Sequence, residues 1–186
     1  MCAARRSFAP GGAIDLLKKN GYAPIIYNPA VLASPYSIPA PPDSGRASIS
    51  ISAASSLSAG LSPGCPSTGA SWAAHTQNYV ETTTSTTSPL TVALPPKTGA
   101  VDFWIDFVSF STEDNLLEFT IGLLDEDGSG STVSFQATAA AITCSGYVAI
   151  WHRRSGQITQ VSIRPSGARQ FLLPAVIRVA DKATKK

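Results

Sequence analysis

The chain has 186 residues and a formal net charge of +2, and only 14% of its residues are charged. This length allows one domain with a substantial core. So few charges are unusual for a freely diffusing cytosolic enzyme, whose surface carries more Lys and Glu. No stretch approaches the roughly 18 apolar residues of a membrane-spanning helix. No apolar segment follows Arg5 and Arg6, so no secretory signal is expected.

Residues 1–45 predict an extended arm. A short helix is expected over residues 13–19, and Asn20-Gly21 provides its left-handed stop. Six prolines then lie between Pro24 and Pro42, which excludes an interior strand. The segment is also too apolar for a solvated linker. It therefore needs a surface, on its own domain or on a neighbouring subunit, for Ile25, Ile26, Tyr27, Val31, Leu32, Tyr36 and Ile38.

From Arg46 onward, apolar residues alternate with polar ones. The clearest case is "VDFWIDFVSF", in which Val101, Phe103 and Ile105 share one face. Turn signals rich in Gly, Pro, Asn and Ser separate such stretches. The pattern predicts an all-β fold, an antiparallel β-sandwich of about eight strands. We expect this domain to span residues 46–181, with a basic tail at 182–186.

Charge is unevenly distributed along the chain. Eight of the twelve acidic residues lie between Asp102 and Asp127, and eight of the fourteen basic residues lie between Arg153 and Lys186. Such segregation could support head-to-tail contacts between copies, which would make the chain a homo-oligomer. The alternative is that both regions are neighbours in the fold and neutralise each other.

The stretch "LLDEDGSGSTVSFQ" contains part of a calcium-loop pattern. Asp125, Asp127 and Ser129 occupy positions 1, 3 and 5, and Gly130 occupies position 6. Position 12 is Gln136, which offers no bidentate carboxylate. A hairpin bend with Gly128 and Gly130 at positive φ explains the stretch without a metal. The pattern therefore favours a turn over a cation site.

Catalytic and cofactor signals are weak throughout the sequence. His75 and His152 are the only histidines, and no nucleophile elbow, zinc spacing or phosphate loop is present. Asp102 and Asp106 share a strand face, but four strand residues span roughly 13 Å, too far for a concerted pair. Cys65 and Cys144 could form a disulfide, although reduced thiols are favoured. We expect no enzyme activity and no cofactor.

Two binding functions are weighed on the remaining residues. Four bases in the first twenty residues are few for a genome-binding arm, so contact with nucleic acid would be incidental. Carbohydrate recognition stays open, because Trp72, Trp104 and Trp151 could stack on sugar rings if they lie exposed and together.

The proline-rich arm followed by Ser- and Thr-rich strands resembles the layout of viral structural proteins. In jelly-roll coat proteins and phage capsid-decorating proteins, an N-terminal arm extends across a neighbouring subunit. The resemblance implies a virion protein made in the host cytoplasm, with a structural role in the shell or in its decoration. Its partners would be copies of itself and other virion proteins, with the arm residues as interface anchors. The alternatives are a carbohydrate-binding β-sandwich module and a coat protein that contacts the genome.

Overall fold

The fold is known from a computed structural model. It describes residues 2–7, 16–27, 36–53, 57–61, 78–82, 87–107, 115–125, 127–139, 145–152, 156–167, 171–174 and 177–181. Within these ranges the secondary structure consists of strands and one short helix, α1. No helix of the described residues is long and apolar enough to cross a bilayer.

Eight strands form the first sheet. They are β1 (Cys2–Ser7), β2 (Ile25–Tyr27), β5 (Leu57–Leu61), β6 (Asn78–Thr82), β8 (Thr98–Phe107), β11 (Ser145–His152), β13 (Phe171–Pro174) and β14 (Ile177–Asp181). Their order is β1-β11-β8-β13-β6-β5, and β14 pairs with both β8 and β2. Every pairing in this sheet is antiparallel.

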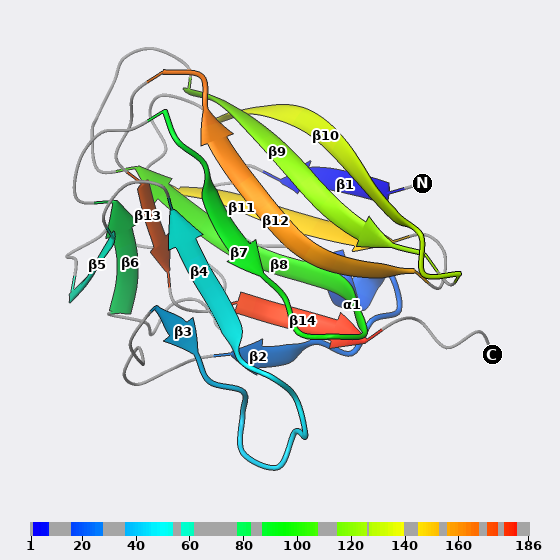
Figure 1. The fold of residues 1–186 in the computed structure, drawn as a ribbon. Coiled ribbons are helices and arrows are strands. Elements are labelled where there is room, and N and C mark those ends of the chain that lie inside the picture. Colours follow the sequence, from blue (N-terminus) through cyan, green and yellow to red (C-terminus); the bar gives the residue numbers. More distant parts are fainter. Residues whose placement is uncertain are drawn as a thin grey trace.

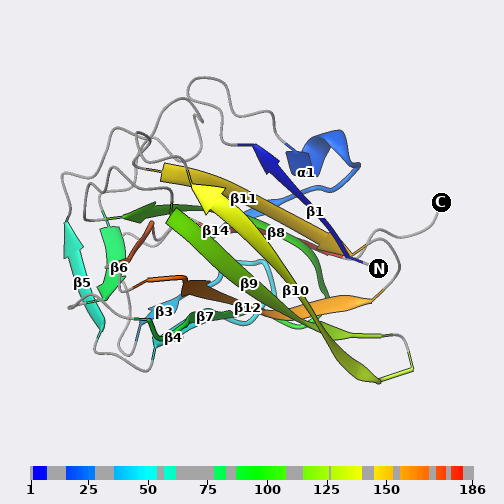
Figure 2. The ribbon, with the colours of Figure 1, turned by 90° about the horizontal axis from the view of Figure 1, so that it is seen from above.

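Six strands form the second sheet. They are β3 (Ser37–Ile38), β4 (Ile49–Ala53), β7 (Leu90–Ala93), β9 (Asn115–Leu124), β10 (Gly130–Ala139) and β12 (Gln157–Pro165). The order is β10-β9-β12-β7-β4-β3, again with antiparallel pairings only. Figure 1 shows this sheet in front of the first, and Figure 2 shows the two layers from above.

The core lies between the two sheets because apolar residues alternate along most strands. In β9, Leu117, Phe119 and Ile121 are fully buried, and in β8 Phe103 is fully buried. Phe119 also stacks on Phe135 of the neighbouring strand, with ring centroids 5.0 Å apart. Burying each such side chain contributes about 1.5–3 kcal/mol to folding. The predicted all-β antiparallel sandwich is confirmed.

The strand count is higher than expected, since the described residues form fourteen strands. Part of the excess comes from the predicted arm, which supplies β1 and β2 to the first sheet and β3 to the second. Residues from both sides of the expected boundary at residue 45 therefore share sheets and core. The predicted basic tail, 182–186, lies outside the described residues.

The helix α1 (Leu16–Lys19) covers part of the outer face of the first sheet. Leu16 and Leu17 are buried there, and Tyr22 follows after the left-handed Gly21, with φ of 81°. Together they form a second apolar cluster with residues of β8, β11 and β14, namely Ala100, Ala149, Trp151 and Ala180. The predicted helix stop at Asn20-Gly21 is confirmed, because the N–H of Gly21 donates to the carbonyl of Lys18.

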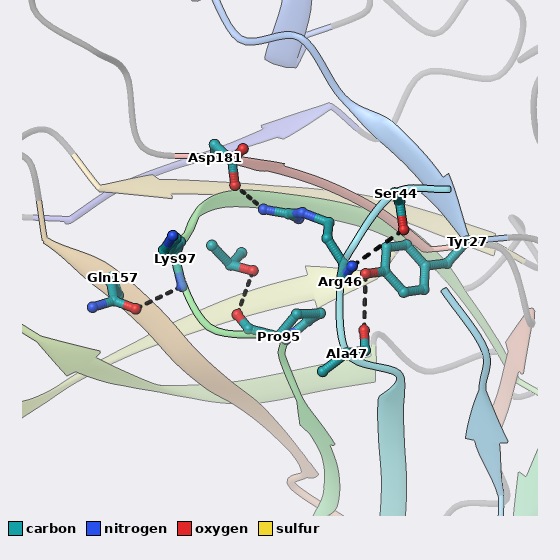
Figure 3. A network of polar contacts seen from close by, with 9 residues as sticks. Tyr27, Ser44, Arg46, Ala47, Pro95, Lys97, Gln157 and Asp181 are labelled. Atoms are coloured by element: carbon teal, nitrogen blue, oxygen red, sulfur yellow. Dashed lines mark hydrogen bonds and ion pairs between the residues drawn. The ribbon is translucent and has the colours of Figure 1, made fainter. Parts of the chain in front are cut away.

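A polar network joins β2 of the predicted arm, the first residues of the predicted domain and the C-terminal strand (Figure 3). The guanidinium of Arg46 pairs with the carboxylate of Asp181, at the end of β14. The hydroxyl of Tyr27 donates to the carbonyl of Ala47 at 3.0 Å. Burial raises the pKa of Tyr27 above its usual value, and the charge of Arg46 opposes part of this rise. The network joins β2, the segment before β4 and β14.

Candidate functional site

The outer face of the six-stranded sheet is lined by polar side chains. They alternate with the core residues along each strand, so the same period that builds the core also builds this face. We call it the hydroxyl face, because more than half of its polar residues are Ser or Thr. Its residues are Ser37, Ser50, Ser52, Thr91, Glu118, Thr120, Thr132, Ser134, Gln136, Thr159, Gln160, Ser162 and Arg164.

One row of this face consists of hydroxyl side chains only. Strand register places them side by side across five strands, in the order Ser134, Thr120, Ser162, Thr91 and Ser52. The hydroxyls of Thr120 and Ser134 lie 3.0 Å apart, and those of Thr91 and Ser162 lie 3.2 Å apart. Each hydroxyl can donate one hydrogen bond and accept two, so the row keeps unused capacity toward solvent.

A second row adds an amide and two opposite charges. Gln136, Glu118 and Arg164 are register partners on β10, β9 and β12. Among the ion pairs of the described residues, none joins Glu118 to Arg164. The carboxylate only accepts hydrogen bonds and the guanidinium only donates them, so this row offers both kinds of contact to a ligand.

A β-bulge in β12 directs further polar groups onto the face. The register with β9 shifts between Ile158 and Gln160, and both Thr159 and Gln160 are exposed. Gly122 of β9 lies beneath them: a Cβ there would come within 2.7 Å of the Thr159 Oγ1 and 2.8 Å of the Gln160 Cγ. Glycine is required for this close approach. Bulges of this kind often re-aim side chains beside functional sites.

The residues of the partial calcium-loop pattern form a hairpin turn, the structure that the sequence favoured over a cation site. The N–H of Asp125 donates to the carbonyl of Ser129 at 2.9 Å, and Gly128 has φ of 81°. The Asp127 Oδ1 accepts from both the N–H and the hydroxyl of Ser129, at 2.9 and 2.6 Å. The described residues contain no group of three His, Cys, Asp or Glu side chains that could hold a metal. Gly130, in contrast to the prediction, does not have positive φ.

His152 lies close to that turn, which the sequence did not indicate. It is buried rather than exposed, and its Nε2 is 3.7 Å from the Asp125 Oδ1. Its carbonyl accepts a hydrogen bond from the Tyr22 hydroxyl at 3.0 Å. A Cβ on Gly156 would come within 2.6 Å of the imidazole ring. The histidine is therefore packed into the structure and not open to a substrate.

Of the three tryptophans weighed as a stacking platform, Trp151 is the one whose side chain is described. Trp151 is buried in the small cluster beneath α1. Trp104 belongs to β8 of the other sheet, and Trp72 lies outside the described residues, as do His75, Cys65 and Cys144. Asp102 is fully buried and pairs with the guanidinium of Arg178, so it has a structural partner.

The predicted arm anchors are divided between core and surface. Tyr27 and Ile38 are fully buried in the chain's own core, which leaves them unavailable to a neighbouring subunit. Ile25 and Tyr36 pack partly against the same core, and Ile26 is 43% exposed. Val31 and Leu32 lie outside the described residues. The sequence left two surfaces open for the arm, its own domain or a neighbouring subunit. Tyr27 and Ile38 lie on its own domain, so these two residues do not serve as the predicted interface anchors.

The sequence matches no protein-family model and no curated protein. Among solved structures, the chain resembles the carbohydrate-binding and catalytic modules of Clostridium thermocellum xylanase 10B in complex with xylohexaose. That match has a TM-score of 0.47 at 12% identity, and it covers 70% of this chain and 25% of the other. The chain thus corresponds to about a quarter of that structure's length.

Two further structures are similar at comparable levels. The C-terminal family 22 carbohydrate-binding module of the same xylanase matches with a TM-score of 0.40 and 14% identity, over 73% of this chain and 88% of the module. The enzymatically active domain of tailspike protein 4 from bacteriophage CBA120 matches with a TM-score of 0.39 and 11% identity, over 70% of this chain and 18% of the other. These resemblances concern the type of fold and do not identify binding residues.

The prediction of a virion assembly protein is wrong. The solved structures that resemble the chain include carbohydrate-binding modules of a xylanase and the enzymatically active domain of a phage tailspike. The main physical argument for assembly was an apolar arm that had to be covered, either by its own domain or by a neighbouring subunit. Tyr27 and Ile38 are buried within the chain itself, so covering them does not require a neighbouring subunit.

Proposed function

We propose that the chain is a carbohydrate-binding β-sandwich module that holds a glycan on its hydroxyl face, without catalysing a reaction. The observation that carries this proposal is the row of five hydroxyl side chains across the sheet, flanked by Gln160 and by the Gln136–Glu118–Arg164 row. Sugars present hydroxyl groups that donate and accept hydrogen bonds. A surface of Ser, Thr and amide side chains can meet both needs.

The chemistry of the face fits a glycan better than it fits other partners. Its central described positions carry no aromatic and no large apolar side chain, so it lacks the apolar centre of a protein interface. One basic residue, Arg164, among the described positions is too few for a phosphate backbone, whose binding depends on many neutralised charges.

Binding without catalysis is the simplest use of this face. Most glycosidases place two carboxylates on either side of the scissile bond. Among the described residues of the hydroxyl face, Glu118 supplies one carboxylate and no second one accompanies it. The partly exposed Glu118 is then a hydrogen-bond acceptor for a sugar hydroxyl.

A glycan array tests the proposal with the whole chain and two variants. Thr120→Val with Ser162→Ala removes two central hydroxyls while keeping the shape of the sheet. At about 1 kcal/mol for each lost hydrogen bond, binding should fall roughly tenfold or more. The matched control is Ile26→Ser, at an exposed position of the other sheet, and it should bind like the wild type. A wild-type chain that binds no neutral glycan, or a double variant that binds equally well, would contradict the proposal.

A further inference from the structure

Strand β10 ends the six-stranded sheet and presents a long open edge. It pairs with β9 through ten consecutive residues, from Gly130 opposite Leu124 to Ala139 opposite Asn115. No described strand pairs with its other side. Figure 1 shows β10 as the outermost strand at the upper right of the molecule. An edge of this length offers a row of backbone donors and acceptors to another strand.

The hydrogen bonds of the hairpin determine which backbone groups face that open edge. The N–H of Asp125 donates to the carbonyl of Ser129, and bonded and non-bonded pairs then alternate along the ladder. Thr132 and Ser134 therefore direct their N–H and C=O groups away from β9. A hydrogen bond on the opposite side of β9 agrees with this alternation. The carbonyl of Leu116 points away from β10 and accepts from the N–H of Ser166, which follows β12.

Protective features common at edges are missing from β10. Residues 130–139 include no charged residue and no proline, and the ladder with β9 has no bulge. In contrast, β3 at the opposite end of the same sheet has two residues, and the edge strand β1 carries Arg5 and Arg6. Short length and charge are two ways in which proteins keep edges from pairing.

The side chains of β10 also leave the core partly open at this edge. Val133 and Phe135 face the inside of the sandwich, yet both remain only partly buried. The exposed Thr132 and Ser134 face the opposite way. A strand that completes this edge must place apolar residues on the inner side and small polar residues on the outer side.

We propose that the open edge of β10 pairs with β10 of a second copy of this chain, antiparallel about a two-fold axis at Ser134. Such an axis keeps inward-facing residues opposite inward-facing residues across the interface, because Val133 then lies opposite Phe135 of the second copy. Ser134 lies opposite its own equivalent, and both direct their backbone groups into the interface. No like charges meet, because residues 130–139 are uncharged. The interface is isologous, the type that closes as a dimer.

The dimer joins two six-stranded sheets into one and places both hydroxyl faces on the same side. The hydroxyl row from Ser52 to Ser134 then continues into the equivalent row of the second copy. Two binding faces on one rigid surface can engage a single polymer chain, which raises its apparent affinity without new contacts. The pairing itself does not depend on the ligand of the hydroxyl face.

Light scattering after gel filtration of the whole chain, over a range of concentrations, tests the pairing. The wild type should show the mass of a dimer. Ser134→Pro removes a donor that faces the edge and leaves the ladder with β9 intact, so it should halve the measured mass. Ser134→Lys should do the same, because two like charges would meet at the axis. The matched control, Ser52→Lys, lies on the same row at the far side of the sheet and should stay dimeric.

A mixing experiment makes the test independent of folding defects. Ser134→Lys and Ser134→Glu chains should each be monomeric, and an equal mixture should form a heterodimer. A wild type that stays monomeric at every concentration would overturn the proposal. So would a dimer that persists in all Ser134 variants, since another surface would then hold it. Failure of the glycan array leaves these outcomes unchanged.

Discussion

The outer faces of the two sheets differ in what covers them. The first sheet is partly covered by the chain itself, where Leu16, Leu17 and Tyr22 pack on small residues and Trp151. A buried Asp102–Arg178 pair lies on the same side of that sheet. No described element covers the second sheet, and the described residues of its outer face carry hydroxyls, amides and one residue of each charge. The covered face is built for stability, and the open face has polar groups to offer a ligand.

The comparison is tested most strongly at the buried ion pair of the covered face. Arg178→Met leaves the carboxylate of Asp102 buried with one partner lost, and it should lower the free energy of unfolding by about 3–5 kcal/mol. Urea denaturation followed by circular dichroism measures this change. The double variant Asp102→Leu with Arg178→Met should recover most of the loss, since no buried charge remains. Equal stability of the single variant and the wild type would show that the pair is not buried.

A somewhat smaller effect is expected beneath the helix. Leu17 is fully buried against the first sheet, so Leu17→Ala should cost about 2–3 kcal/mol through lost burial and a residual cavity. The same denaturation experiment applies. Lys19→Ala, an exposed neighbour on the helix, is the control and should change stability by no more than about 0.5 kcal/mol. If both variants behave alike, the helix does not pack on the sheet.

On the open face, Gly122 should matter most to stability. The Cβ of Gly122→Ala would meet Thr159 and Gln160 at 2.7 and 2.8 Å, which should cost about 1–2 kcal/mol and displace the bulge. The variant should also weaken glycan binding, because Gln160 moves. Gly130→Ala is the matched control: its Cβ would be 3.9 Å from the carbonyl of Leu123. Thermal unfolding and the glycan array together separate the two variants.

The smallest effect is expected at the hairpin that joins β9 and β10. The hydroxyl and N–H of Ser129 hold the pKa of Asp127 below its usual value. A lowered pKa in the folded chain stabilises it at pH values above the ordinary carboxyl range, and this contribution is lost as the pH falls below that range. Asp127→Ala should therefore unfold at a slightly lower temperature near neutral pH. The difference from the wild type should disappear in acid, and a difference independent of pH would contradict this account.

Much of the architecture could be predicted from the period of the sequence. Alternation such as that of Val101, Phe103 and Ile105 identified strands, and the turn chemistry around Gly128 identified a hairpin. The position of the arm in the fold could not be predicted from this period. Its prolines excluded interior strands, but the short strands β2 and β3 avoid them, and the apolar side chains of Tyr27 and Ile38 enter the core.

The candidate site was harder to predict than the fold. The serines and threonines that alternate with core residues were visible, and they marked outward positions. Their alignment depends on register between strands far apart in the chain, such as Thr91 beside Ser162. The alternation of residues within one strand also does not determine the order of the strands in a sheet. The row from Ser52 to Ser134 therefore could not be predicted from the sequence. Trp151 was a misleading signal, because it packs beneath α1.

Nuclear magnetic resonance tests the central claim, that the open face binds glycans, most directly. The ¹⁵N-labelled whole chain is titrated with the neutral glycan that gives the strongest array signal. The account predicts amide shifts concentrated at Thr91, Thr120, Gln160 and Ser162. The Thr120→Val, Ser162→Ala variant should need a roughly tenfold higher glycan concentration for shifts of the same size. Shifts confined to the first sheet, or no shifts with any neutral glycan, would contradict it.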